Sequence, residues 1–281
     1  MSLIEIKNLY YKYDKDTKSP YALKDINLCI DRGDFIAIIG NTGSGKSTLI
    51  KHINALIKPT EGEVLFDGVN IYSKDYNLKE LRKKIGMVFQ YPDYQLFAET
   101  VLEDVAFAAT NYGYDKNKSE EMATNILRFM EIEDLKDRSP FMLSGGEKRK
   151  VAFSGSVVLD PEVIILDEPE AGLDPSSRVK FFNHLKTLNE KGKTIIFVTH
   201  NLDDVVEYAD KVVVLNEGEL IKVTDVRSAF YDEELIEKAN INTPDIINVI
   251  NEYKEIYDDF DITKIRFNEF IEELKKYKSI K

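Results

Sequence analysis

The sequence is nearly without cysteine, because Cys29 is the only one among 281 residues. A single thiol excludes a disulfide framework and a cysteine-based metal site within one chain. Cys29 stands in the apolar alternation of residues 26–30 (INLCI), so we expect it to be buried as a small hydrophobic side chain.

Positive charge is also in short supply. The chain has 38 Lys and Arg residues against 50 Asp and Glu residues, which gives a formal net charge of −12 at pH 7. Proteins that bind nucleic acid normally carry a basic surface, and none is evident here. We therefore expect no nucleic-acid partner, and the acidity is typical of a cytoplasmic protein.

A third absence is that of any long apolar run. A helix that spans a bilayer needs about 20 apolar residues, and no segment approaches that length. Residues 1–9 (MSLIEIKNL) lack the basic start and the apolar run of a signal peptide. We expect a cytoplasmic protein, and if it works at a membrane, other chains must supply the spans.

The sequence does have enough apolar content, 43% of its residues, for a large core in one domain or in one domain with an appendage. Residues 100 to 158 show helical spacing, with Ser119 as a candidate cap. Before them, alternating or continuous apolar segments indicate strands at residues 3–9, 26–30, 34–40, 62–68 and 85–89.

Strands and helices alternate again after this helical stretch. Strands are expected at residues 163–167, 194–199 and 211–215, and helices at 176–189 and after Asn201. This order is typical of a parallel sheet, so the sequence predicts an α/β fold with a helical insertion.

The chain changes character again at about residue 223. Thr243 is expected to cap a helix whose first residue is Pro244. A last helix carries a stripe of Phe267, Phe270, Ile271 and Leu274. Such amphipathic helices pack either on the rest of this chain or on a partner chain, and the sequence leaves both alternatives open.

Residues 40–48 (GNTGSGKST) follow an apolar strand and open a helix, which is the context of a phosphate-binding loop. Glycines let backbone N–H groups turn toward phosphates, and the helix N-terminus adds partial positive charge. Lys46 is expected to reach the β- and γ-phosphates of ATP, and the Ser47 hydroxyl to bind Mg²⁺.

Two carboxylates follow the apolar strand of residues 163–167. Asp167 ends that strand beside the phosphate-binding loop, where a carboxylate can hold the Mg²⁺ shell. Glu168 comes next and is the candidate general base that orients the attacking water.

Two further polar residues end apolar strands. His200 is expected at the same edge of the sheet, within reach of the γ-phosphate or of Glu168. Gln90 can touch Mg²⁺ or the attacking water without adding charge. His52 and His184 fall in expected helices without chemically matched neighbours, and we interpret both as structural.

Residues 143–147 (LSGGE) are a second loop suited to phosphate, which the same site has no obvious use for. That surplus indicates two such chains closing over ATP. Four motifs stand in a fixed order, at residues 40–48, 143–147, 163–168 and 198–200. In this order they resemble the ATP-binding subunit of ABC transporters, over residues 1–222. The resemblance implies an ABC-type P-loop domain with a RecA-like core sheet, an antiparallel β subdomain and a helical subdomain at about residues 91–158. Residues 223–281 would form a C-terminal helical extension, with a possible role in dimerisation.

The resemblance also implies roles for single residues. The γ-phosphate of the opposite subunit would meet the loop of Ser144, Gly145, Gly146 and Glu147, in which Glu147 replaces the usual Gln. Asp174 would communicate across the dimer. Tyr13, or alternatively Tyr11, would stack on adenine. The rest of the nucleotide-binding set is Asn41, Thr42, Gly43, Ser44, Gly45, Lys46, Ser47 and Thr48.

Residues 89–107 (FQYPDYQLFAETVLEDVAF) are similar to the energy-coupling factor and cobalt-type ATPases, and Pro169 matches one of the two ATPase types of such transporters. Two positions depart from the pattern: Glu170 stands where Thr is usual, and residues 107–113 lack the usual Gly-Pro. In this family the segment Tyr91–Phe97 would receive coupling helices of a transmembrane scaffold. Its aromatics and carboxylate suit a basic amphipathic helix, although a surface loop packed on its own domain is the alternative.

The resemblance therefore implies an ATP-hydrolysing motor at the cytoplasmic face of the membrane. Its partners would be a second ATPase, identical or related, a transmembrane scaffold and a substrate-capturing membrane protein. The cargo would be a vitamin or a transition-metal ion such as cobalt or nickel. Two other classes are weighed against it. A soluble ABC ATPase of DNA repair, chromosome structure or translation usually carries a coiled-coil insertion or a second cassette, and neither is present. A non-catalytic ATP-binding subunit is disfavoured by intact Lys46, Ser144, Glu168 and His200.

Overall fold

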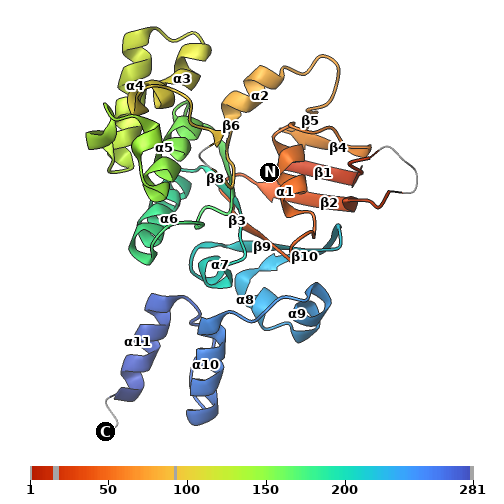
Figure 1. Cartoon of the computed structure of the whole chain (residues 1–281). Helices are drawn as coiled ribbons and strands as arrows, with labels where there is room; N and C mark the ends of the chain where they lie inside the picture. Colours follow the sequence, from red (N-terminus) through yellow and green to blue (C-terminus); the bar gives the residue numbers. More distant parts are fainter. Residues whose placement is uncertain (1, 15–18, 92–93, 279–281) are drawn as a thin grey trace.

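The computed structural model describes residues 2–14, 19–91 and 94–278, and its larger sheet confirms the α/β prediction (Figure 1). The six strands lie in the order β10-β9-β3-β8-β7-β6. Neighbouring strands are parallel except for the antiparallel pair β9–β10. The strands are β3 (Phe35–Ile39), β6 (Ile85–Val88), β7 (Val163–Asp167), β8 (Thr194–Val198), β9 (Lys211–Asn216) and β10 (Glu219–Asp225).

The central strands of this sheet are buried on both faces. All five residues of β3 are buried, and they divide between two hydrophobic clusters. Phe35, Ala37 and Ile39 belong to one cluster, and Ile36 and Ile38 to the other. A strand covered on both faces needs a continuous apolar run, which is why the sequence signal was strong here.

A second, antiparallel sheet lies beside the first, in the order β2-β1-β4-β5. Helix α1 (Lys46–Ile53) shares its hydrophobic cluster. The prediction that Cys29 is buried is wrong: Leu28 and Ile30 point inward, so Cys29 between them is exposed. The strands are β1 (Ser2–Tyr11), β2 (Leu23–Asp31), β4 (Glu61–Phe66) and β5 (Val69–Asn70).

Three α-helices lie between β6 and β7 in the described part of the chain, as the prediction of a helical insertion requires. They are α3 (Val101–Asn111), α4 (Lys116–Phe129) and α5 (Gly145–Val157). Ser119 does not cap α4. Asp115 does, because its side chain accepts a hydrogen bond from the Lys118 N–H, and Ser119 lies buried one turn inside the helix. The other helices around the sheet are α2 (Leu78–Lys84), α6 (Pro175–Glu190) and α7 (Leu202–Tyr208).

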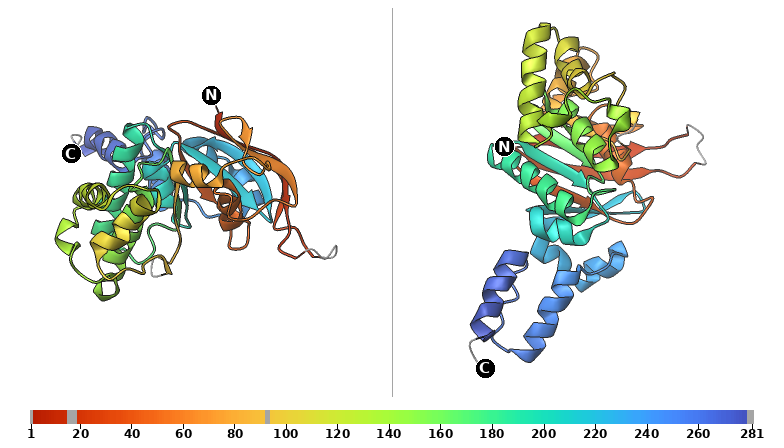
Figure 2. Two further views of the ribbon diagram at one scale, coloured as in Figure 1. Left: turned by 90° about the horizontal axis from the view of Figure 1, so that it is seen from above. Right: turned by 60° about the vertical axis from the view of Figure 1, so that its left-hand side comes forward.

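The described residues end in four helices, of which the last two stand side by side at the end opposite α3 and α4 (Figures 1 and 2). They are α8 (Val226–Phe230), α9 (Glu233–Ala239), α10 (Asp245–Ile256) and α11 (Phe267–Lys278). Thr243 is not the cap of α10: the helix begins at Asp245, and the flanking residue is Pro244. A ring cluster joins α10 to α11 through Tyr253, Tyr257, Phe260, Phe270 and Tyr277.

The final helix pair is tied to α7 by polar contacts. The Glu207 carboxylate accepts a hydrogen bond from the Phe267 N–H at 2.9 Å, at the start of α11. The Arg266 guanidinium donates to the Ala209 carbonyl and to Asp210, at 3.2 and 3.1 Å. Ile247, Ile250 and Phe270 belong to the same hydrophobic cluster as β3, so the apolar stripes of these helices pack at least in part on this same chain.

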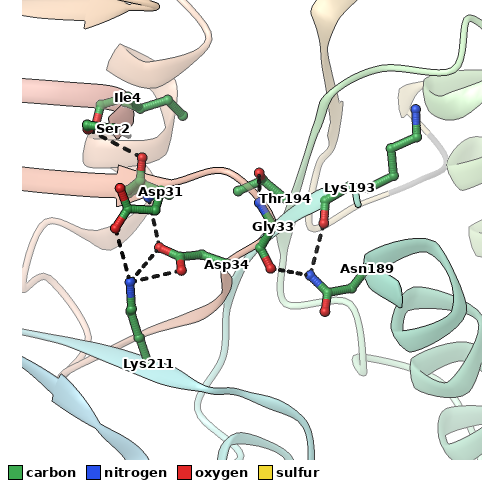
Figure 3. Close-up of polar contacts among 10 residues, drawn as sticks. Ser2, Ile4, Asp31, Gly33, Asp34, Asn189, Lys193, Thr194 and Lys211 are labelled. Carbon is green, nitrogen blue, oxygen red and sulfur yellow. Dashed lines mark hydrogen bonds and ion pairs between the residues drawn. The ribbon is translucent and has the colours of Figure 1, made fainter. Parts of the chain in front are cut away.

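A polar network fixes the N-terminal edge of the sheet, at the end opposite the strand carboxyl termini (Figure 3). The Asn189 side-chain amide donates to the carbonyls of Gly33 and Lys193, at 2.7 and 2.9 Å. The Thr194 hydroxyl accepts from the Gly33 N–H at 2.9 Å, and Lys211 pairs with Asp34 at 2.9 Å. One amide thus joins the end of α6 to the entries of β3 and β8.

We expect Asn189→Ala to lower the free energy of unfolding by about 1–3 kcal/mol, because it leaves two partly buried carbonyls without their donor. Nucleotide affinity should not change, since this edge lies away from the phosphate-binding loop. Chemical denaturation and a nucleotide-binding titration measure the two quantities. Asn183→Ala is the control, as an exposed asparagine on the same helix. Equal stability of the two variants would contradict the role given to Asn189.

Candidate functional site

The loop between β3 and α1 folds tightly against the end of β9. Gly40 has φ +143°, and a Cβ at this position would lie 2.1 Å from the Leu215 carbonyl oxygen. Gly45, with φ +102°, precedes the first residue of α1. Glycine at these two positions lets the backbone make the turn and leaves the helix N-terminus open toward an anion.

Lys46 is buried and lies over its own loop. Its ammonium donates to the carbonyls of Gly40 and Asn41, both at 2.8 Å. Burial lowers the pKa of Lys46, and the nearby carboxylates of Glu168 and Asp167 oppose that effect. The sequence-predicted cation therefore stands at the phosphate-binding loop, with two acids in its electrostatic range.

Asp167 ends β7 and faces Ser47. The Ser47 hydroxyl donates to the Asp167 carboxylate at 3.3 Å. Burial raises the pKa of Asp167, and the hydrogen bond from Ser47 opposes the shift. A hydroxyl and a carboxylate oxygen are the donors that Mg²⁺ prefers, so these two residues fit the metal expected here.

Glu168 is held from several sides at the edge of the sheet. The Gln90 amide donates to one of its carboxylate oxygens at 2.6 Å, and His200 Nε2 lies 3.4 Å from the other. The Glu168 N–H donates to the Val198 carbonyl at 2.9 Å. Three residues that follow β6, β7 and β8 therefore meet here. The sequence predicted His200 at this edge within reach of Glu168, whereas the contact between Gln90 and Glu168 was not predicted.

Several of the groups described above, though not Gly40, Asn41 or Asp167, line a cavity of about 580 Å³. Tyr13 is part of the wall; the residue is 65% exposed, and its hydroxyl lies 2.8 Å from the Thr48 hydroxyl. The lining residues are Tyr13, Ala22, Thr42, Gly43, Gly45, Lys46, Ser47, Thr48, Gln90, Glu168 and His200.

Tyr11 lies behind Tyr13 and is only partly exposed. Its ring contacts Tyr13 on one side and His52 on the other, with centroid distances of 5.0 and 4.7 Å. His52 is fully buried, its Nδ1 lies 2.8 Å from the Thr48 carbonyl oxygen, and burial lowers its pKa to about 4. The pair supports the loop from behind, which agrees with a structural His52.

The loop of residues 143–147 lies outside the lining of this cavity. Ser144 caps α5 in a capping box: its hydroxyl accepts from the Glu147 N–H, and its own N–H donates to the Glu147 carboxylate at 2.8 Å. The Ser144 hydroxyl also donates to the Glu147 carboxylate at 2.7 Å, and this bond together with that from the Ser144 N–H lowers the pKa of Glu147. Asp174, also outside the lining, caps α6 by accepting from the N–H groups of Ser176 and Ser177. The predicted across-dimer residues are thus ordered without contributing to this chain's own cavity.

Two charged residues of the site were missed or left without a role by the sequence reasoning. Arg149 of α5 is only 4% exposed and donates to the backbone carbonyls of Glu168 and Gln90. Its position three and four residues before the buried Ala152 and Phe153 was a signal for an inward face. Glu170, noted only as a departure from a pattern, accepts from the Thr199 hydroxyl at 2.5 Å, and burial raises its pKa.

The segment Tyr91–Phe97 presents aromatic rings to solvent. Tyr91, Tyr94 and Phe97 are 59%, 89% and 56% exposed. Gln95 turns inward, because its side chain accepts from the Phe89 N–H at 3.1 Å, and Leu96 is buried. The remaining two residues of the segment, Pro92 and Asp93, lie outside the described residues.

Comparisons with known proteins identify the class. Residues 23–171 match the family model described as ABC transporter. The chain belongs to this family and is an ABC-type ATPase that binds ATP. A solved relative is the ATP-binding cassette MJ0796, in a dimeric post-hydrolysis state bound to ADP and Pi. It is 33% identical with a TM-score of 0.73, over 79% of this chain and 98% of that one.

Within the family, the chain belongs to the ATP-binding subunits of energy-coupling factor transporters. The energy-coupling factor transporter ATP-binding protein EcfA2 of Acetivibrio thermocellus is 42% identical over 98% of both chains. The EcfA2 of Caldanaerobacter subterraneus is 42% identical over 90% of this chain and 89% of its own. The structure of cbiO1 from Clostridium perfringens, described as part of the transporter complex cbiONQ, is 40% identical with a TM-score of 0.74. That match covers 85% of this chain and 94% of that one.

We expect Gly40→Ala to abolish ATP binding, since the added Cβ would meet backbone that cannot move aside without displacing β9. Gly113→Ala is the matched control: Gly113 also has positive φ, +91°, but no atom lies within 4 Å of its Cβ position. A fluorescent-nucleotide titration with thermal unfolding of both variants makes the measurement. Unchanged affinity in Gly40→Ala would contradict the close approach described here.

Proposed function

We propose that this chain is one of the two ATPase motors of an energy-coupling factor importer, at the cytoplasmic face of the membrane. The observation that supports it most is the meeting of Gln90, Glu168 and His200 beside the loop that carries Lys46. No single one of these residues indicates hydrolysis, but a carboxylate oriented by an amide and an imidazole next to a phosphate-binding loop does.

The proposed chemistry assigns a role to each side chain in the cavity. Lys46 binds the β- and γ-phosphates of ATP, while Ser47, Asp167 and Gln90 hold the Mg²⁺ shell. Bound Mg²⁺ neutralises the charge that develops on the phosphates. Glu168 accepts the proton of the attacking water, and His200 contacts the γ-phosphate and helps to orient Glu168.

The nucleotide would lie along the cavity from Tyr13 to His200. Tyr13 stacks on adenine in this proposal, and its open ring face supports the choice over Tyr11, which packs between Tyr13 and His52. In this proposal the phosphates meet the cavity lining of Thr42, Gly43, Gly45, Lys46, Ser47 and Thr48, together with Asn41 and Ser44 of the same loop.

A second ATPase subunit completes the site in this proposal. Ser144, Gly145, Gly146 and Glu147 meet the γ-phosphate held by the partner, and Asp174 contacts the partner across the interface. Their absence from this chain's own cavity supports the assignment. The partner is either a second copy or a related ATPase.

The membrane partners would be a transmembrane scaffold and a substrate-capturing protein. No helix of the described residues is long and apolar enough to cross a membrane. We propose that the scaffold's coupling helices bind at Tyr91–Phe97, where three exposed rings lie in one segment. The cargo would be a vitamin or a transition-metal ion such as cobalt or nickel.

We also propose a division of the chain at residues 222 and 223. Residues 1–222 would form the ATPase domain, with a helical subdomain at about 91–158, and residues 223–281 an extension with a role in dimerisation. This boundary falls within β10, whose last three residues still pair with β9. The attachment of α11 to α7 through Glu207 and Arg266 supports an ordered extension.

We expect Glu168→Gln to keep ATP affinity and to lower turnover at least about tenfold, because the amide cannot accept the proton of water. The ATP-bound dimer should then accumulate, which size-exclusion chromatography with ATP detects. Lys46→Ala is the contrasting variant, since it should lose ATP binding together with turnover. A Glu168→Gln protein with the parental ATPase rate would remove Glu168 from the role of general base.

Purification of the tagged chain from its native membranes in mild detergent should recover a polytopic membrane protein, a second ATPase and small membrane proteins. Mass spectrometry would identify these proteins, and the small membrane proteins would indicate which cargo is transported. The double change Tyr91→Ser and Tyr94→Ser should lose the polytopic protein and keep ATP binding. Val69→Ser, at an exposed apolar residue of β5, is the control. Recovery of soluble partners only would count against the transporter assignment, and full recovery by the double variant would refute the proposed scaffold contact.

A further inference from the structure

One buried side chain, that of Arg149, bridges the carboxyl ends of β6 and β7, at the edge of the sheet that carries Gln90 and Glu168. Arg149 Nη1 donates to the Glu168 carbonyl at 2.6 Å, and Nη2 donates to the Gln90 carbonyl at 3.0 Å. Glu168 follows β7 and Gln90 lies just beyond β6. The guanidinium therefore fixes the main chain of the same two residues whose side chains meet at 2.6 Å on the other side.

Glu168 needs such support because its backbone is unfavourable. Its φ of +50° lies in the left-handed region, which a residue with a Cβ rarely adopts. Such a conformation persists only where the surroundings fix it. Here the Glu168 N–H is bonded to the Val198 carbonyl, and the Glu168 carbonyl is bonded to Arg149. With both ends of the residue fixed, the carboxylate is directed toward Gln90 and His200.

Arginine also suits the position better than other cations. Two diverging N–H groups of one planar group reach two separate carbonyls, whereas a lysine ammonium is a single point on a flexible stem. Burial lowers the pKa of the Arg149 guanidinium. The nearby carboxylates of Glu170 and Glu168 oppose that shift and so offset part of the cost of burying the charge. The residue is thus held in place by its surroundings as well as holding them.

The place of Arg149 on α5 gives this contact a direction. Arg149 lies on the first turns of the helix that Ser144 caps and that Gly145 begins. A displacement of α5 therefore moves the donor shared by Glu168 and Gln90. A movement at the start of α5 would therefore change the position of the Glu168 carboxylate through the side chain of Arg149.

We propose that Arg149 is a positioning residue for ATP hydrolysis. It holds Glu168 in its left-handed backbone conformation and fixes the main chain of Gln90 next to it. This inference rests on the proposed roles of Glu168 and Gln90. Arg149 does not touch the nucleotide cavity, so its effect is on the rate of the chemical step and not on the binding of ATP.

The test compares Arg149→Gln, Arg149→Lys and the control Lys150→Gln, which removes the same charge at the next residue of α5. Each variant is purified with whatever partners the tagged chain retains, and kcat and KM for ATP are measured. We expect Arg149→Gln to lower kcat at least about tenfold with KM within about twofold, since small misplacements of a catalytic group cost up to about a hundredfold. Arg149→Lys should recover part of the rate, and Lys150→Gln should match the parent.

A second measurement asks whether Arg149 acts through Glu168. In a background of Glu168→Gln, the further change Arg149→Gln should lower the residual rate by less than about twofold, because coupled residues are not additive. A full tenfold loss in that background would overturn the inference. Equal kcat for Arg149→Gln and Lys150→Gln would also overturn it, as would a parallel loss of ATP binding that Arg149→Lys does not restore.

The failure of this inference differs from that of the proposed function. If Arg149→Gln hydrolyses ATP normally while Glu168→Gln does not, Arg149 is refuted and Glu168 remains the base. If Glu168→Gln itself retains full turnover, the proposed chemistry fails, and Arg149 has no base to position. Should Arg149→Gln be recovered unfolded, the kcat of Arg149→Lys decides alone: a rate equal to the parent overturns the inference, and a lower rate at equal KM supports it.

Discussion

The site depends on one constraint: parallel strands that are buried on both faces can expose polar groups only at their ends. Strands β3, β6, β7 and β8 run in the same direction, so their carboxyl ends meet at one edge. The phosphate-binding loop, Gln90, Asp167, Glu168 and His200 all follow directly from that edge. The opposite edge is held by the Asn189 amide and by the ion pairs of Lys211 with Asp31 and Asp34, which leaves the reactive groups on a rigid base (Figure 3).

Several residues at this edge have a burial or a backbone conformation that is energetically unfavourable. Lys46 and Asp167 are almost fully buried. Burial lowers the pKa of Lys46 and raises that of Asp167, so it favours the neutral form of each. Glu168 has a backbone conformation that residues with a Cβ avoid. Buried charges and strained backbone persist where the surrounding fold is stable enough to hold them. The apolar strands and the contacts of Arg149 provide that stability, so packing and chemistry are joined at the same few residues.

The sequence predicted the parts of the molecule that depend on continuous patterns. β3 and β7 were visible as apolar runs, and the loop of residues 40–48 through its glycines and lysine. The sequence predicted less accurately the features that depend on which face of a strand a residue occupies, or on a single capping residue. Cys29 stands in an apolar segment yet faces solvent, since its two neighbours occupy the inward positions. The start of α4 was misplaced because Ser119 and Asp115 are both good caps, and the choice depends on tertiary packing.

Arg149 marks the limit of sequence reasoning more sharply. A charged residue on the buried face of a helix can be recognised from spacing, but its two acceptors are backbone carbonyls that no side-chain pattern reveals. The same holds for the left-handed conformation of Glu168. Function at this edge rests on main-chain geometry as much as on side chains. In the proposed dimer, a second cassette would approach α5 at Ser144, at the start of the helix that carries this contact, so that closure and the placement of the proposed base Glu168 would depend on the same helix.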